Sequence, residues 1–276
     1  MKKNKTAALK PAEYSPEHKL FLKKQKHKKI LALSLQIGLL IALLGLWELL
    51  TQINLLDPFI MSSPSRVCKM LVTLISDGSL FTHIFTTLYE CVLGFIIATI
   101  LGVIIAVILW WSETVRKVLD PYIVVLNSLP KIALGPIIIV WVGVGAQAII
   151  VMAVLISVIV TILSVLNGFL SCDKDKILLM RSMGANKFQI LCKLILPHAF
   201  PDIISALKIN VGLAWVGTIM GEYLVSRAGL GYLIVYGGTV FKLDLVMAST
   251  VVLCILAAIM YGAVSVLEKR IYKRQR

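Results

Sequence analysis

The stretch RSMGANKFQILCKLILP, residues 181–197, interrupts two long apolar runs of the chain. It is polar at its start, carries three basic side chains and ends on a proline, whereas the residues around it are mainly Val, Ile and Leu. A polar segment between such runs is typical of a connection that leaves a membrane. The fold therefore depends on whether the flanking runs can span a bilayer.

The composition around this stretch is that of a membrane protein. Of 276 residues, 59% are apolar and only 15% charged, and the mean hydropathy is +0.91. A bilayer core of roughly 30 Å requires about 20 apolar residues per helix, because every backbone polar group must be bonded within the segment. The sequence therefore predicts an all-α polytopic membrane protein with about six transmembrane helices. The expected spans are Ile30–Leu50, Ile84–Trp110, Val118–Val142, Ala146–Phe169, Ile203–Leu224 and Leu245–Leu267.

The basic residues are distributed unevenly. The chain has 28 Lys and Arg against 14 Asp and Glu, a net charge of +14. Ten basic residues lie in 1–29, five in 170–193 and five after Leu267. The positive-inside rule then predicts that both termini and the loop 170–197 are cytoplasmic. We expect a basic N-terminal segment (1–29) that binds anionic lipid and no nucleic acid, a transmembrane permease-like domain (30–268) and a basic tail (269–276).

Cysteine and histidine spacing indicates neither a metal site nor a disulfide framework. The five cysteines lack a CxxC pair and fall on different segments, and the four histidines are equally scattered. We expect no cofactor.

Two further patterns concern packing. Residues 62–78 predict a short amphipathic helix that begins at Pro64 and closes at Asp77-Gly78, with an apolar stripe that starts at Val67. Small residues recur every four positions from Gly94 to Ala106, and again at Gly217 and Gly221. Such rows allow helices to approach closely, either within the subunit or between subunits.

The third expected span contains two prolines, Pro130 and Pro136, which predict a broken helix. Broken helices inside membranes line a cavity or are covered by protein. Lys131, beside the break, lines a pathway or contacts a carbonyl group. Glu90 and Glu222 lie toward the expected outer ends of their helices, where a place at the membrane interface is the first interpretation and a pore contact the second.

The 181–197 stretch resembles the cytoplasmic loop motif of ABC importer permeases. In that family the motif begins Glu-Ala-Ala, reaches a Gly after three residues and ends in an Ile-x-Leu-Pro-like group after nine more. Here nine residues separate Gly184 from LILP, residues 194–197. The stretches LPKIALGPIIIVWVGVG (129–145) and LPHAFPDIISALKINVGLAWVGTIMGEYLVSRAGLGYLI (196–234) are similar to permeases of the nitrate, taurine and alkanesulfonate class, with relatives for thiamine precursors and riboflavin.

This resemblance implies a permease subunit that imports a small solute. It implies two short helices joined at Gly184, with Phe188, Leu191 and Ile195 on one face and Pro197 as the end of the second helix. The implied ATPase-coupling residues are Arg181, Ser182, Met183, Gly184, Ala185, Asn186, Lys187, Phe188, Leu191 and Pro197, and the candidates for lining the pathway are Pro130, Lys131, Pro136 and Glu222. One departure is that Leu178, Leu179 and Met180 stand where the family has Glu-Ala-Ala.

The resemblance also implies partners. These are a cytoplasmic ATP-binding subunit, an extracytoplasmic substrate-binding protein and a second permease copy. The sequence has no GxxxxGK[ST] phosphate loop, so ATP is expected to be hydrolysed elsewhere and the chain is not expected to be an enzyme. The alternatives are a stand-alone ion- or proton-coupled transporter, for which the chain has few carboxylates at mid-membrane depth, and a membrane-embedded enzyme, for which no catalytic cluster is found.

Overall fold

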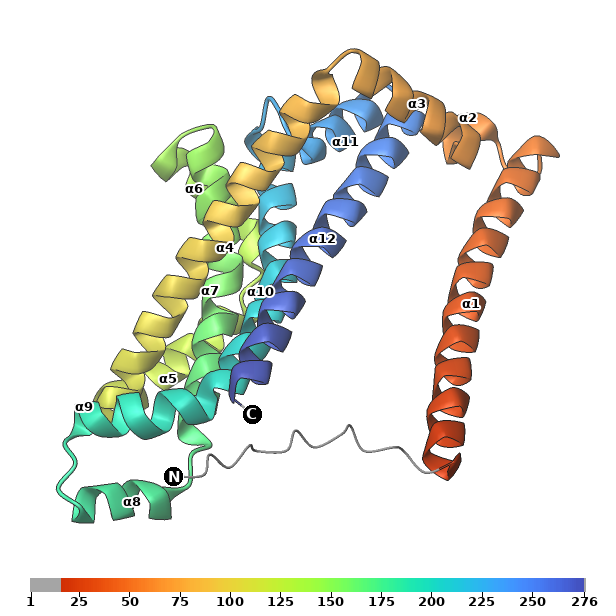
Figure 1. Cartoon of the computed structure of the whole chain (residues 1–276). Coiled ribbons are helices and arrows are strands. Elements are labelled where there is room, and N and C mark those ends of the chain that lie inside the picture. The colour runs from red at the N-terminus through yellow and green to blue at the C-terminus, as the bar shows by residue number, and fades with distance from the viewer. Residues whose placement is uncertain (1–15, 276) are drawn as a thin grey trace, which may run out of the picture. The chain divides into compact units, whose positions relative to one another are not determined.

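The computed structural model describes residues 16–275, and within that range it contains helices and no strands (Figure 1). Two compact units divide at Ser65 and Arg66. The first contains α1 (Pro16–Gln52) and α2 (Pro58–Met61), and α3 (Pro64–Ser76) begins at the division. The second continues with α4 (Ser79–Trp111), α5 (Glu113–Ser128), η1 (Lys131–Leu134), α6 (Gly135–Val142), α7 (Ala146–Leu170), α8 (Lys174–Ser182), α9 (Lys187–Ile190), η2 (Leu191–Ile195), α10 (Leu196–Val225), α11 (Leu230–Thr239) and α12 (Leu243–Gln275).

The first unit is dominated by α1, which runs unbroken from the basic segment into the expected first span. Residues 23–52 of it are long and apolar enough to cross a membrane. The helix begins at Pro16, well before residue 30, because Lys, Gln and Leu are good helix formers and Pro suits a first helical turn. Residues 1–15 of the expected cytoplasmic segment lie outside the described residues.

Four helices of the second unit are also long and apolar enough to span a membrane, so five of the six expected spans are confirmed as single helices. The four helices of the second unit are residues 79–111, 146–170, 187–225 and 243–270. The remaining expected span is split into α5 and the η1–α6 segment, which bend by 90° at the break. Counted as one span, the bent pair gives six.

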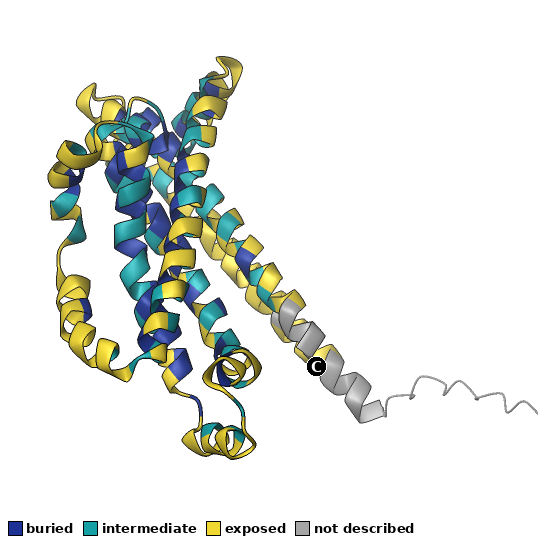
Figure 2. Ribbon diagram, turned by 90° about the vertical axis from the view of Figure 1, so that its left-hand side faces the viewer, coloured by how far each residue is buried: buried dark blue, intermediate teal, exposed yellow. Residues whose placement is uncertain are grey.

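The core of the second unit lies where α7 packs between α4 and α10 (Figure 2). Glycines allow this close approach. A Cβ on Gly94 would lie 2.6 Å from the Ala153 Cβ, and one on Gly217 would lie 2.5 Å from the Ala153 Cα. The two small-residue rows therefore pack helices within one subunit, which confirms the first of the two interpretations.

These contacts also give the helix directions. Gly94 and Gly102 of α4 face Ala153 and Thr161 of α7, so the residue numbers rise together and the two helices are parallel. The chain between them must return from one end of the bundle to the other, and α5 and α6 do this (Figure 1). Figure 1 shows α12 antiparallel to α10, with the end of α12 toward α8 and α9, and an ion pair of Lys208 with Glu268 joins the two helices.

Short helices cover the opposite end of the unit. The helix predicted within 62–78 is confirmed as α3, which begins at Pro64, ends at Ser76 and is followed by Gly78 with a φ of +70°. Its Val67 and Leu74 are buried, and Leu74 packs with Leu230 of α11 in one apolar cluster. Arg66 pairs with Asp244 at 2.9 Å, which joins α3 to the first turn of α12.

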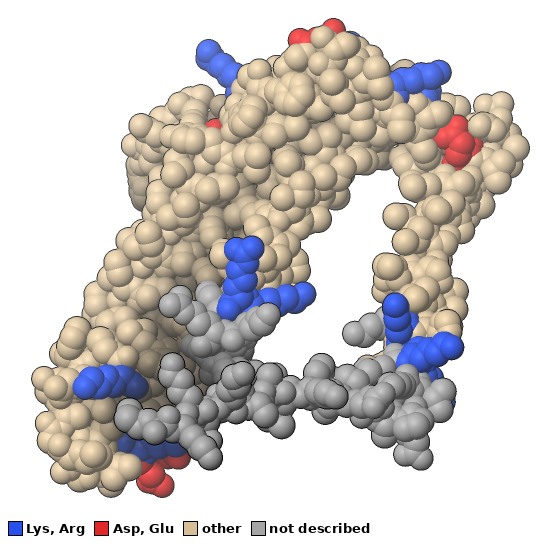
Figure 3. All heavy atoms as spheres, viewed as in Figure 1, with Lys and Arg blue, Asp and Glu red and all other residues tan. Residues whose placement is uncertain are grey.

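Charge is sparse along the membrane-spanning part of the second unit. The face of α4 shown in Figure 3 is formed by uncharged side chains, while Lys, Arg and acidic residues lie at its end near α8 and α9. This distribution suits a bundle whose sides face lipid and whose ends face water.

Candidate functional site

The loop between α7 and α10 is the first part of the candidate site. After α7 ends at Leu170, Cys172 is buried and Asp173 caps α8 by accepting a hydrogen bond from the Asp175 N–H at 2.9 Å. Burial raises the pKa of the Cys172 thiol. The loop is thus ordered from its first residues, and α8 starts where a capping side chain is present.

Gly184 makes the turn between α8 and α9. Its φ is +80°, its N–H donates to the Arg181 carbonyl at 2.9 Å, and the Ala185 N–H donates to the Met180 carbonyl at 3.0 Å. This pair of bonds is the Schellman arrangement that ends a helix on a left-handed residue. The expected turn at Gly184 and the short helix before it are confirmed, but the helix after the turn is not short, because it continues from Lys187 to Val225.

The start of α9 is fixed by a capping box that the sequence prediction missed. Asn186 Oδ1 accepts from the Gln189 N–H at 2.8 Å, and Gln189 Oε1 accepts from the Asn186 N–H at 2.9 Å. The signal was present in the sequence as a capping residue followed three positions later by Gln. The ends of α8 and α9 at the turn are therefore both capped.

Pro197 does not end the second helix, contrary to the sequence prediction. The chain passes from α9 through a π-helical turn, residues 191–195, and continues as α10 to Val225. In the π turn the Leu196 N–H donates to the Leu191 carbonyl, five residues back. Pro197 has no N–H to donate, and its ring would clash with a carbonyl of the preceding turn in a regular α-helix. The wider π turn before Pro197 relieves this clash, and the helix continues.

The apolar side chains of the loop divide into two groups. Leu191 and Ile195 are buried in the cluster at this end of the bundle, whereas Phe188 is 62% exposed and Met183 is 78% exposed. Phe188, Leu191 and Ile195 were predicted to lie on one face of the helix, but their surroundings differ, because Leu191 and Ile195 pack against α7 and α4 while Phe188 is exposed. Leu178 and Leu179, which replace the acidic residue and first alanine of the family motif, are exposed as well.

The broken span is the second part of the candidate site. The helix is interrupted at Leu129 and Pro130. Pro136 lies in the first turn of α6, where a proline is tolerated. The Lys131 Nζ donates to the Asn127 carbonyl at 3.3 Å. The carbonyl contact expected as one interpretation of Lys131 is thus present, and a pathway-lining role stays a prediction.

Glu222 and Glu90 are buried within the protein, each about 1% exposed, where the sequence had suggested the membrane interface. Glu222 accepts from the Gly231 N–H at the start of α11, and Glu90 lies close to Glu222. The cost of burial is only partly offset, because Glu90 Oε2 and Glu222 Oε1 have no hydrogen-bond partner among the residues that the structure describes. The place of Glu222 on a pathway stays a prediction.

The same helix start has two further partners that the sequence analysis missed. Thr87 accepts from the Leu230 N–H at 2.8 Å, and His83 Nδ1 accepts from the Gly229 N–H at 2.9 Å. Side chains of α4 and α10 thus satisfy the free N–H groups of α11. No periodic signal marks them, because the partners lie about 140 residues apart in the chain.

Among the residues that the structure describes, no three His, Cys, Asp or Glu side chains are grouped so that they could hold a metal ion.

A comparison with known protein families identifies the family to which this chain belongs. Residues 98–274, which include the broken span, the capped loop and α11, match the family of binding-protein-dependent transport system inner membrane components. The chain belongs to this family. It is a multi-pass permease of the ABC importer type.

Relatives with curated names agree with this assignment. The taurine transport system permease protein TauC of Escherichia coli (strain K12) is 28% identical over 86% of this chain and 88% of its own length. The formylaminopyrimidine transport permease protein ThiX of Halalkalibacterium halodurans is 28% identical over 82% of this chain and 90% of its own.

Solved structures share the permease fold. A chain of the inward-facing MetNI methionine ABC transporter aligns with a TM-score of 0.63 at 22% identity, covering 71% of this chain and 97% of that chain. A chain of the bacterial alginate ABC transporter, solved with a periplasmic protein, also gives 0.63 at 15% identity and covers 91% and 96%.

Proposed function

We propose that two copies of this permease form the translocation pathway of an importer, and that a separate ATPase subunit supplies energy by docking on α8 and α9. The observation that carries the proposal is the exposed apolar pair Met183 and Phe188, which lie on either side of the Gly184 turn. Exposed apolar side chains on a rigid polar loop are typical of a docking surface rather than of a solvated connection.

The continuous helix after the turn gives the loop a mechanical role. Because α9, the π turn and α10 form one unbroken helix, a displacement at Phe188 is transmitted into the membrane-spanning part of α10. The far end of α10 holds α11 through Glu222 and Gly231. Closure of an ATPase pair on the loop would then shift α10 and α11 together between inward-open and outward-open states.

The solute is the second part of the proposal. TauC is named for taurine and ThiX for formylaminopyrimidine, so we propose a small polar organic solute of that size delivered by an extracytoplasmic binding protein. Pro130, Lys131, Pro136 and Glu222 are proposed to line its route. Identification of the small molecule that co-purifies with the binding protein would name it.

A reconstituted complex tests the coupling part. The full permease is co-expressed with its ATPase and binding protein, and substrate-stimulated ATP hydrolysis is measured in vesicles. We expect stimulation with the wild-type permease and its loss when Met183 and Phe188 are both changed to Ser, with the permease still inserted. Stimulation equal to wild type in that variant would refute α8 and α9 as the docking surface.

A further inference from the structure

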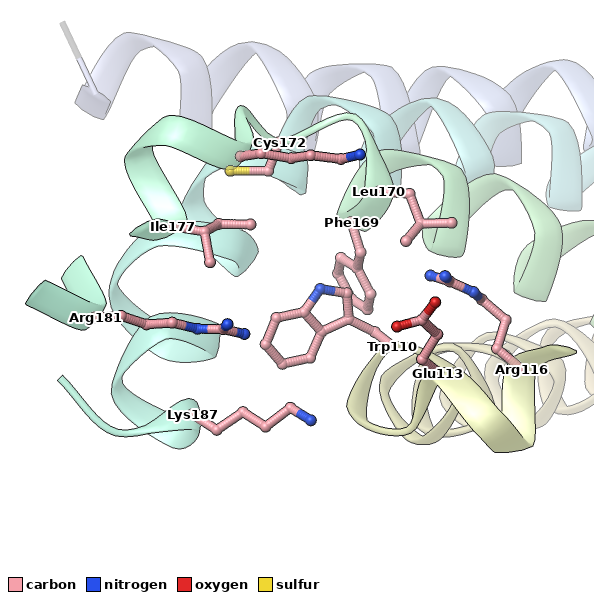
Figure 4. Close-up of a pocket in the computed structure, with 10 residues that line it drawn as sticks. Trp110, Glu113, Arg116, Phe169, Leu170, Cys172, Ile177, Arg181 and Lys187 are labelled. Carbon is pink, nitrogen blue, oxygen red and sulfur yellow. The ribbon is translucent and has the colours of Figure 1, made fainter. Parts of the chain in front are cut away.

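A cavity of about 320 Å³ lies where α4 and α7 end (Figure 4). Trp110 is near the end of α4, Phe169 is near the end of α7, and α8 closes the opposite side with Ile177. The volume is at the lower end of the range for small-ligand pockets, roughly 300–1,000 Å³. This cavity is separate from the exposed Met183 and Phe188.

The lining of the cavity is strongly basic. Four basic side chains from three helices border it with one carboxylate, Glu113. The basic residues are Arg116 of α5, Lys174 and Arg181 of α8, and Lys187 of α9. Glu113 forms an ion pair with Lys117 at 3.0 Å, and Lys117 does not border the cavity.

The basic side chains outnumber the carboxylate beside them: Glu113 acts electrostatically on Arg116 and Lys174, but its ion pair is with Lys117. Among residues 23–270, side chains of which the structure describes, Arg116, Lys174 and Arg181 form no ion pair. Lys187 donates to the Trp111 carbonyl and lies over its ring at 5.5 Å, and among the described residues it has no carboxylate partner. Four positive charges around a single carboxylate repel one another, and an anion between them lowers that cost.

The surroundings of the cavity indicate where the anion comes from. Both helices whose ends form it are long enough to span the membrane, so the cavity lies at the level of the lipid headgroups. Trp110 and Trp111 are typical residues of that level. On α5, two and three residues after Arg116, Val118 is 59% exposed and Leu119 39%, so the helix that carries one of the cavity residues also exposes apolar side chains.

We propose that this cavity binds the phosphate group of an anionic phospholipid, whose acyl chains lie along the exposed apolar side chains of α5. Arginine forks and lysine ammonium groups are the usual protein partners of phosphate, and basic pockets between membrane helices are known to take lipid headgroups. The proposal goes beyond the importer function and does not depend on which side of the membrane the loop faces, since both surfaces present headgroups.

The experiment uses the full permease, purified in a mild detergent, with native mass spectrometry of bound lipid as the readout. Phosphatidylglycerol, phosphatidylcholine and inorganic phosphate are titrated separately. We expect phosphatidylglycerol to bind at least about tenfold more tightly than phosphatidylcholine. Lys174→Gln should weaken its binding about fivefold, and Arg116→Gln with Lys174→Gln roughly 25-fold.

Lys176→Gln is the matched control, because it removes the same charge from the same helix but does not border the cavity. It should change binding less than twofold. The double variant Arg116→Lys with Lys174→Arg keeps the charge and should retain most of the binding, which separates loss of charge from misfolding. Lys174 is the first residue of α8, but the readout is lipid bound to the permease without its ATPase, so a failure here leaves the coupling proposal intact.

Three results would overturn the proposal. Equal losses for Lys174→Gln and Lys176→Gln would show diffuse attraction, and full binding by Arg116→Gln with Lys174→Gln would exclude the cavity. Complete displacement of phosphatidylglycerol by millimolar inorganic phosphate would assign the cavity to a free anion instead of a lipid.

Discussion

A side chain at Gly184 would be unfavourable because of the backbone conformation and not because of steric overlap with neighbouring atoms. Its φ is +80°, and a Cβ placed there would meet no atom within 4 Å. A left-handed residue with a side chain costs roughly 1–2 kcal/mol, and more for a branched one. We expect Gly184→Val to weaken association with the ATPase subunit about 5- to 30-fold.

Gly184→Asn is the comparison for that variant, because Asn tolerates the left-handed region. It should retain most of the association, measured by co-purification and substrate-stimulated hydrolysis. Equal binding by wild type and Gly184→Val would mean that the turn does not position the docking helices.

Phe188 and Leu191 lie in one short segment but face different surroundings. Phe188 is 62% exposed and Leu191 is 5% exposed. Phe188→Ala should weaken ATPase association about tenfold with unchanged thermal stability, as expected for an interface anchor. Leu191→Ala should lower the free energy of unfolding by about 2–5 kcal/mol, because it leaves a cavity in the core. If Phe188→Ala destabilises the permease as much as Leu191→Ala, Phe188 is structural and not an anchor.

At the scale of elements, α10 offers a pair of glycines that tests the packing. A Cβ on Gly217 would overlap the α7 backbone at the Ala153 Cα, whereas one on Gly212 would meet no atom within 4 Å. Gly217→Ala should destabilise the permease by about 1–3 kcal/mol. Gly212→Ala should stabilise it by about 0.5–1 kcal/mol, because alanine suits a helix interior better than glycine. Thermal unfolding in detergent measures both, and similar values for the two variants would contradict the contact between α7 and α10.

The bent pair of α5 and α6 presents Lys131 at its break. If this side chain lines the pathway, Lys131→Met should reduce solute uptake by roughly an order of magnitude, while Lys131→Arg retains most of it. The permease should still co-purify with the ATPase in both cases. Normal uptake by Lys131→Met would leave the bond to the Asn127 carbonyl as the whole role of Lys131.

The helices also show which structural features could be predicted from the sequence. Apolar length predicted five spans, and the prolines predicted the break, because these features are local in the chain. The 90° bend at Pro130 could not be predicted, since a proline removes a hydrogen bond but does not fix the angle that neighbouring helices impose. Pro197 was misassigned for the same reason, as a π turn absorbs it. The bonds from α11 to His83 and Thr87 join segments that no spacing connects.

At the scale of the whole molecule, the number of crossings decides which termini share a side. The parallel arrangement of α4 and α7 requires the chain between them to cross back, so the bent pair counts as a crossing. With α12 antiparallel to α10, the C-terminal end lies on the side of α8 and α9. An α1 that spans the membrane would bring the N-terminus to that side as well.

Single cysteines tested with a membrane-impermeant maleimide on intact cells can check this topology. Cys68, Cys192 and Cys254 are exposed and must be replaced first, whereas Cys172 is buried with a raised thiol pKa and should react slowly. A single cysteine at residue 10, at 274 or at Met183 should stay unlabelled until the cells are opened. One at Phe241, in the exposed turn before α12, should label at once.

The pattern of labelling separates the ways in which this topology could be wrong. Labelling of residue 10 alone would mean that α1 does not cross, because every other position belongs to the second unit and keeps its side. Labelling of 274 and Met183 together, with Phe241 protected, would mean that the second unit is inverted and that the positive-inside rule fails for this chain. Labelling of 274 but not Met183 would contradict the antiparallel packing of α10 and α12, since the ion pair between Lys208 and Glu268 requires those helix ends to lie on one side.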